Sequence, residues 1–189
     1  MNFLQTNIGV WMSARIEPIK NGSLPEGNLM DNLWSPWRMR YITDNEKPGE
    51  CIFCSYPKMT DGIENLIVHR GKTAYVILNR FPYTSGHVMV VPFQHESSIE
   101  ALSTDVRGEM MELVNETLGV LRKVYQPEGF NIGINMGSAA GAGIAEHAHI
   151  HIVPRWVGDT NFMSTTAETR VIPEDMEVTY RRISEVWSK

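Results

Sequence analysis

The sequence predicts an α+β domain built on an antiparallel sheet, and three observations carry that prediction. Short aliphatic segments typical of strands recur between residues 66 and 92. One longer segment, residues 103–125, has its apolar residues at helical spacing. Two further strand-like segments follow at residues 130–136 and 146–155. This order of strands, helix and strands is typical of an α+β domain.

The first three strands are predicted from their composition and from the turns between them. Residues 66–70 and 73–79 are rich in aliphatic and β-branched side chains and are separated by a glycine-lysine turn. Residues 80–86 contain a proline and a glycine and are predicted to form a loop. Residues 87–92 are apolar almost throughout, which indicates a central strand.

The central helix is predicted together with its ends. Ser103 is a good N-cap and Asp105 suits the first turn, while basic residues occupy the last turn, where the helix dipole favours them. Pro127 and Gly129 are expected to stop this helix. A second helix is predicted over residues 173–187, because proline is tolerated at the first helical position.

The first thirty residues show no periodic pattern, and an aromatic segment follows them. Residues 1–30 are dense in turn formers and are predicted to be a flexible N-terminal arm, leaving residues 31–189 as a single domain with a C-terminal helical extension. Residues 33–42 contain three large aromatic side chains and are interpreted as a lid on the core. In the alternative interpretation, Arg38 or Arg40 in this segment lies near an anion.

Composition excludes several classes of function. A formal net charge of −5 argues against a general nucleic-acid binder, and the longest apolar runs fall short of the roughly 20 residues that span a bilayer. The N-terminus lacks the pattern of a signal peptide, and two cysteines do not make a secreted disulfide scaffold. We therefore expect a cytoplasmic protein that binds neither membrane nor nucleic acid.

Half of the six histidines lie at every second position of one short segment: His147, His149 and His151. Small and aliphatic residues stand between them, and this period of two predicts a strand with one apolar face and one face of imidazoles. The preceding loop, residues 137–143, consists almost wholly of glycine and alanine. Its backbone amides could approach a phosphate closely. A neutral imidazole such as His149 could then attack phosphorus, with His151 tuning charge or relaying a proton.

The two cysteines, Cys51 and Cys54, have the spacing of half a zinc site. His95 and His147 could supply the other two ligands. A site with four protein ligands has no open position for substrate and would be structural. Spacing alone leaves a redox pair or free thiols as alternatives.

Residues 147–153, His-Ala-His-Ile-His-Ile-Val, resemble the defining motif of the histidine triad family of nucleotide hydrolases and transferases. The flanking residues 135–143 and 153–163 are similar to the bacterial branch that contains diadenosine polyphosphate phosphorylases. The resemblance covers roughly residues 33–187. It implies a five-stranded antiparallel sheet with flanking helices, the histidine triad fold, with the sheets of a homodimer joined.

The resemblance also implies a role for each candidate residue. His149 would be the nucleophile that becomes covalently nucleotidylated, and His151 would support it. A nucleotide would be held by Asn79 at the ribose, by His87 at the phosphate site, and by Asn135, Gly143 and Ile144 at the α-phosphate. Structural Zn²⁺ would be held by Cys51, Cys54, His95 and His147.

The implied activity is cleavage of dinucleoside polyphosphates of the diadenosine tetraphosphate type at the α-phosphate. Small hydrolases of the family carry Gln and then Ser or Thr just before the motif, where this chain has Gly143 and Ile144. The missing hydroxyl favours a nucleotidyltransferase or phosphorylase, with phosphate as acceptor, over a hydrolase. Hydrolysis of dinucleoside polyphosphates or adenosine phosphoramidates, and non-catalytic nucleotide sensing, remain alternatives.

Overall fold

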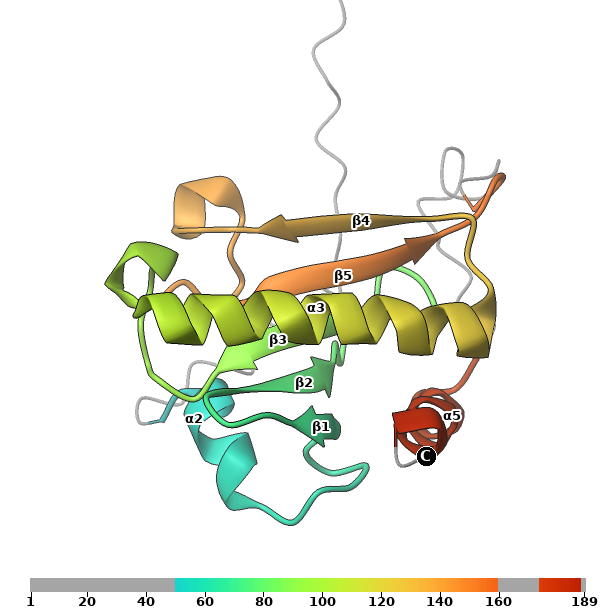
Figure 1. The fold of residues 1–189 in the computed structure, drawn as a ribbon, viewed down its shortest axis with the longest axis horizontal. Coiled ribbons are helices and arrows are strands. Elements are labelled where there is room, and N and C mark those ends of the chain that lie inside the picture. The colour runs from blue at the N-terminus through green and yellow to red at the C-terminus, as the bar shows by residue number, and fades with distance from the viewer. Residues whose placement is uncertain (1–49, 160–173, 188–189) are drawn as a thin grey trace, which may run out of the picture. The chain divides into compact units, whose positions relative to one another are not determined.

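The computed structural model describes residues 50–159 and 174–187, and Figure 1 shows their arrangement. In this part of the chain a five-stranded antiparallel sheet is accompanied by three α-helices. The predicted arm, residues 1–30, and the predicted aromatic lid, residues 33–42, lie outside the described residues. The antiparallel α+β prediction is confirmed.

The sheet places the histidine strand among its inner strands. The strands are β1 (Ile67–Arg70), β2 (Ala74–Leu78), β3 (Val88–Pro92), β4 (Gly129–Ile134) and β5 (Ile150–Arg155), in the order β1-β2-β3-β5-β4. All residues of β2 and β3 are buried, as their continuous apolar sequences require. Met89 of β3 pairs with His151 of β5, so the histidine segment adjoins the most buried strands.

The long helix α3 (Thr104–Tyr125) crosses one face of the sheet in Figure 1. Its N-cap is Ser103, as predicted, whose hydroxyl accepts a hydrogen bond from the Val106 backbone at 3.3 Å. Glu109 on α3 accepts hydrogen bonds from the backbone N–H groups of Lys72 and Thr73. The helix therefore also fixes the turn between β1 and β2.

The C-terminal helix α5 (Met176–Trp187) packs beside β1 and α3. The predicted start at Pro173 is wrong, because the helix begins at Met176. The Asp175 carboxylate accepts a hydrogen bond from the Glu177 N–H at 3.0 Å and caps the first turn. Tyr180 donates to the Ile67 carbonyl at 3.2 Å and attaches α5 to the edge of the sheet.

All five strands differ from their predicted bounds by at least one residue, and β4 and β5 differ most. β4 begins at Gly129, which was expected to belong to the stop after the helix, and it ends at Ile134 rather than residue 136. β5 begins at Ile150, so His147 and His149 precede the strand. The reason is a tertiary contact, since the Ala148 N–H donates to the Glu96 carbonyl at 2.6 Å instead of joining the ladder.

The shortest helices were not predicted. The α-helix α2 (Ile52–Ser55) and the 3₁₀ turns η1 (Tyr56–Lys58), η2 (Ile99–Ala101) and η3 (Ser138–Ala140) have three or four residues each. Such lengths are too short for a period of 3.6 residues to be visible in a sequence. Within residues 50–159 and 174–187, no helix combines the length and apolar character that a membrane span requires.

Candidate functional site

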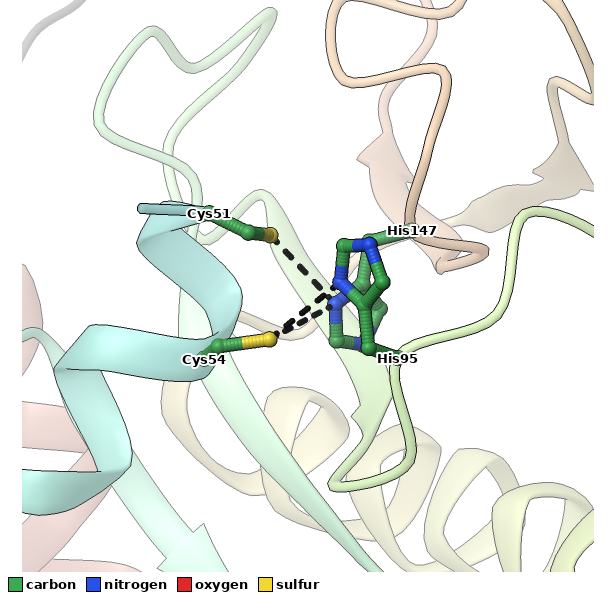
Figure 2. A group of neighbouring side chains, drawn as sticks. All are labelled: Cys51, Cys54, His95 and His147. Carbon is green, nitrogen blue, oxygen red and sulfur yellow. Dashed lines mark hydrogen bonds between the residues drawn. The ribbon is translucent and has the colours of Figure 1, made fainter. Parts of the chain in front are cut away.

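Four side chains from three separate segments converge at one end of the sheet, and Figure 2 shows them together: Cys51, Cys54, His95 and His147. The cysteines lie at α2, His95 follows β3, and His147 lies on the segment that enters β5. One potential ligand atom from each side chain lies within 4.8 Å of all the others. The sequence prediction that these four residues meet is confirmed, and the cluster could bind a metal ion.

Three distances between potential ligand atoms of this cluster match those expected around a tetrahedrally coordinated zinc ion. The His147 Nδ1 atom lies 3.4 Å from the Cys51 Sγ atom and 3.6 Å from the Cys54 Sγ atom, and His95 Nδ1 lies 3.3 Å from Cys54 Sγ. Sulfur and nitrogen ligands of one tetrahedral zinc ion would be separated by roughly 3.5 Å, given bond lengths of about 2.3 and 2.0 Å. A residue set of two thiols and two imidazoles also matches a structural zinc site.

The tautomer of His147 is fixed in the form that such a site needs. Its Nε2–H donates to the Pro92 carbonyl at 2.9 Å, which leaves the Nδ1 lone pair directed at the thiols. Burial raises the pKa of the Cys51 thiol, although the backbone N–H groups of Phe53 and Cys54 at α2 partly oppose this. A cation between the four side chains would offset the cost of a buried thiolate.

His149 lies two residues beyond this cluster and is almost fully buried, with 3% of its surface exposed. Its Nδ1–H donates to the backbone carbonyl of His147 at 2.8 Å. The imidazole Nε2 atom is therefore the one with the free lone pair. Because side chains alternate along extended backbone, His149 and His151 point away from the face that Ile150 and Ile152 pack into the core.

A chain of hydrogen bonds fixes the protons of the neighbouring histidines. The Tyr83 backbone N–H donates to His87 Nδ1 at 3.1 Å, so the His87 proton is on Nε2. That Nε2–H donates to His151 Nδ1 at 3.0 Å, and the His151 proton is therefore on Nε2. The rings of His149 and His151 lie edge to face with centroids 4.8 Å apart. His151 can thus present an N–H beside the free lone pair of His149.

Asn79 joins the same group of residues. Its Nδ2 atom lies 3.4 Å from the His87 ring nitrogens, and its Oδ1 atom accepts a hydrogen bond from the Phe81 N–H at 2.9 Å.

Asn135 is brought to the site by strand pairing. Ile134 of β4 pairs with Ile150 of β5, and the half-buried Asn135 directly follows it. The backbone pairing carries Asn135 to the end of the sheet where the histidine segment begins.

The loop between β4 and the histidines has the shape that its small residues permit. Gly137 and Gly141 have φ values of +80° and +84°, in the left-handed region that favours glycine. Gly143 is exposed, and Ile144 packs against the hydrophobic core. Among the described residues, no hydrogen bond links Gly143 or Ile144 to His149. Within the loop, the N–H groups of Ala140, Gly141 and Ala142 donate to the carbonyls of Gly137 and Ser138.

Two aromatic residues were not anticipated from the sequence. Phe53, on α2 between the two cysteines, places its ring 5.0 Å from the His149 ring and 5.5 Å from the His147 ring. Tyr83 packs on His87 with ring centroids 4.6 Å apart. The signal for Phe53 was its position between two potential ligands, whereas nothing in the sequence around Tyr83 indicates its role.

Burial keeps these imidazoles neutral. Burial, followed by the proximity of His151 and His149, lowers the pKa of His87 to about 3. Burial, followed by the proximity of His149, lowers the pKa of His151 to about 4. The pKa of His149 is lowered by burial too, with its hydrogen bond to the His147 carbonyl opposing the shift. At neutral pH the free Nε2 lone pair of His149 is therefore available to an electrophile.

Acidification is expected to lower the free energy of unfolding through His87 and His151. Their folded pKa values lie well below the ordinary 6.5, so the folded chain binds fewer protons than the unfolded chain between about pH 6.5 and 4. The stability present above pH 6.5 is lost as the pH falls through this window. Between pH 7.0 and 5.5 the loss is about 1 kcal/mol for each histidine, or roughly 2–3 kcal/mol together.

Urea unfolding at these two pH values measures the difference. The His87→Gln variant is expected to lose about 1 kcal/mol of the pH dependence between these two pH values, because one of the histidines with a lowered pKa is removed. Equal unfolding free energies at pH 7.0 and 5.5 in the unsubstituted protein would contradict the assignment.

An antiparallel sheet that carries alternating histidines at the start of an inner strand, after a glycine-rich turn, defines the class of histidine triad proteins. Residues 61–157 match the HIT domain. The chain belongs to this family.

The relatives include named enzymes. The chain is 37% identical over 168 residues to the AP-4-A phosphorylase of Mycobacterium tuberculosis, covering 85% of this chain and 86% of the relative. It is 28% identical over 112 residues to the asymmetrical bis(5'-nucleosyl)-tetraphosphatase of Schizosaccharomyces pombe, covering 59% of this chain and 58% of the relative. A solved Zn-bound histidine triad family protein from Mycobacterium smegmatis matches with a TM-score of 0.59 and 26% identity, over 74% of this chain and 94% of that one.

Proposed function

We propose that the chain is a nucleotidyltransferase that cleaves dinucleoside polyphosphates at the α-phosphate by phosphorolysis, through a covalent nucleotidyl-histidine on His149. The observation that carries this proposal is the hydrogen bond from His149 Nδ1–H to the His147 carbonyl, which leaves Nε2 free to attack. The similarity to a mycobacterial AP-4-A phosphorylase over 85% of the chain supports the substrate class.

The proposed reaction has two displacements. Nε2 of His149 attacks the α-phosphorus of diadenosine tetraphosphate, a P–N bond forms, and the P–O bond to the leaving ATP breaks. Inorganic phosphate then attacks the same phosphorus, the P–N bond breaks, and ADP leaves with His149 neutral again. During the first step the His147 carbonyl stabilises the positive charge that develops on the imidazole, because it accepts the Nδ1 proton.

The neighbouring groups would bind the nucleotide. His151 Nε2–H would donate to an oxygen of the α-phosphate, since its Nδ1 is occupied by His87. Asn79 would bind the ribose, and His87 would line the phosphate site. The α-phosphate would also lie against Asn135 and the backbone of Gly143 and Ile144, where small residues leave amides accessible.

Product analysis tests the proposed reaction. Diadenosine tetraphosphate is incubated with the protein, with and without inorganic phosphate, and the nucleotides are separated by anion-exchange chromatography. Phosphorolysis gives ATP and ADP only when phosphate is present. ATP and AMP without phosphate would instead establish hydrolysis, the alternative that the tetraphosphatase relative favours. No turnover of this substrate would overturn the proposal, and adenosine phosphoramidates would then be the next substrates to test.

We further propose that Cys51, Cys54, His95 and His147 hold Zn²⁺. The residues fit the ion by donor type, by spacing and by the fixed tautomer of His147. With four protein ligands the metal would be structural, and it would join α2 to the segment that carries the nucleophile.

We also propose a homodimer in which the two sheets join along β4. This strand is at one edge of the sheet, and Ile132 on it is 46% exposed. An exposed apolar edge strand is a site at which another chain can pair. Light scattering after size exclusion measures the mass, and Ile132→Lys is expected to shift it from twice the chain mass to that of one chain. A single-chain mass before substitution would overturn the dimer.

A further inference from the structure

The loop of residues 79–87 carries two of the proposed nucleotide-binding side chains and is held together by its own hydrogen bonds. The Asn79 N–H donates to the His87 carbonyl at 3.0 Å, and the Phe81 N–H donates to the Asn79 side chain at 2.9 Å. The His87 N–H in turn donates to the Thr84 carbonyl at 3.2 Å. A shift of the loop would therefore move Asn79 and His87 together.

Gly86 is the residue of this loop that packs against the end of α3. Gly86 has a φ of +77°, and a Cβ atom placed on it would lie 2.9 Å from Cε2 and 3.0 Å from Cδ2 of Tyr125. Real Cβ atoms do not approach other carbons so closely. The Tyr125 ring, at the end of α3, thus occupies the space that a side chain at residue 86 would take, in direct contact with the loop backbone.

The Tyr125 ring is itself fixed by the beginning of α5. Its hydroxyl donates to the Glu174 carboxylate, which also accepts from Thr179 Oγ at 2.8 Å and pairs with Arg182. The Arg182 guanidinium lies over the Tyr125 ring, 4.9 Å from its centroid. Burial, and then the hydrogen bond to Glu174, raises the pKa of Tyr125, so the phenol remains a hydrogen-bond donor.

A small cavity separates the loop from the start of α5. It is lined on one side by Asn79 and residues 85–87, and on the other by Glu174, Met176 and Thr179. At the cavity the loop and the start of α5 are not in close contact, so a slight displacement of the loop meets no side chain there. The contact between Tyr125 and Gly86 opposes such a displacement.

We propose that Tyr125 and Glu174 are positioning residues, which hold the 79–87 loop where His87 Nε2–H donates to His151 Nδ1. The inference rests on the proposed function, because it concerns how the nucleophile's neighbour is oriented. If the loop moves towards α5, the hydrogen bond between His87 and His151 lengthens. His151 can then adopt the other tautomer, whose Nε2 has no proton to donate to the substrate phosphate.

Turnover measurements with two substitutions test the contact from both sides. Tyr125→Leu removes the ring, and Gly86→Ala places a methyl group against it. Each is expected to lower kcat for diadenosine tetraphosphate by about tenfold or more, because His151 no longer donates in the transition state, and to raise KM by a smaller factor, because Asn79 and His87 move with the loop. The double variant is expected to resemble Tyr125→Leu alone, since both changes act on one contact.

Gly158→Ala is the matched control. Gly158 has a similar φ of +82°, but a Cβ atom there would meet nothing within 4 Å. It therefore reproduces the backbone strain of Gly86→Ala without the contact, and its kcat is expected to equal that of the unsubstituted protein. Glu174→Gln keeps a neutral acceptor for Tyr125 but weakens the bond, and a smaller loss of kcat is expected.

Nitrogen-15 NMR of the histidine side chains gives a readout that does not need turnover. The unsubstituted protein is expected to show His151 protonated on Nε2 alone, and Tyr125→Leu to show a mixture of tautomers. Unchanged kcat and tautomer in a folded Tyr125→Leu protein would overturn the inference. Should that variant fail to fold, equal kcat for Gly86→Ala and Gly158→Ala would overturn it instead. An unsubstituted protein without turnover overturns the proposed function, and the NMR comparison then decides the positioning role alone.

Discussion

Replacing His149 with alanine is expected to lower kcat for diadenosine tetraphosphate by roughly 10⁴-fold or more, as removal of a catalytic nucleophile does in other enzymes. The His149 side chain is buried at the end of the sheet, and its imidazole is neutral with an unprotonated Nε2 atom. The loss should appear in kcat more than in KM, because Asn79, His87 and the glycine loop remain to bind the nucleotide.

Mass spectrometry of the denatured protein distinguishes a nucleophile from a binding residue. Incubation with substrate in the absence of phosphate is expected to leave an adenylyl adduct on the unsubstituted chain and none on His149→Ala. His69→Ala is the control, since His69 lies on the edge strand β1, where it stacks on Trp187 of α5 away from His149. An adduct that persists in His149→Ala, or retained turnover, would contradict the covalent mechanism. Nucleotide binding without adduct or turnover in the unsubstituted protein would indicate a sensor.

Removal of the metal ligands is expected to have the largest effect on stability. Cys51→Ser, or a strong chelator, should lower the unfolding midpoint by roughly 10 °C, equivalent to about 3 kcal/mol for a chain of this size. The reason is that these side chains, together with Phe53, join α2 to the segment around His147. The measurements are calorimetry together with zinc content by mass spectrometry.

Ser55→Ala is the control for the metal experiment. Ser55 is on the same short helix, and its hydroxyl donates only to the Ile52 carbonyl among the contacts found in the described chain. Its zinc content and midpoint are expected to stay close to those of the unsubstituted protein. One zinc ion per chain that is lost in both Cys51→Ser and His95→Ala would support four-ligand binding. An unchanged midpoint after chelation would contradict a structural metal.

Much of the fold could be predicted because the sequence patterns are local. The aliphatic runs of β2 and β3 are buried throughout, and α3 begins after the predicted cap, Ser103. The start of β5 could not be predicted from alternation, because His147 and His149 continue the same period of two. The strand begins later since the Ala148 N–H binds the Glu96 carbonyl, a contact between residues distant in the sequence.

The sequence by itself determined the types of residues in the site. Alternating histidines, a glycine-rich loop and a pair of cysteines indicated which atoms could bind a nucleotide or a metal. Only the tertiary structure decided how those atoms are protonated and directed. The tautomers of His149, His87 and His151 depend on carbonyl and N–H groups that the fold brings to each ring. The contact of Tyr125 with Gly86 likewise joins residues 39 positions apart, and spacing in the sequence contains no information about it. Sequence patterns encode local periodicity, whereas hydrogen-bond direction is set by packing between distant segments.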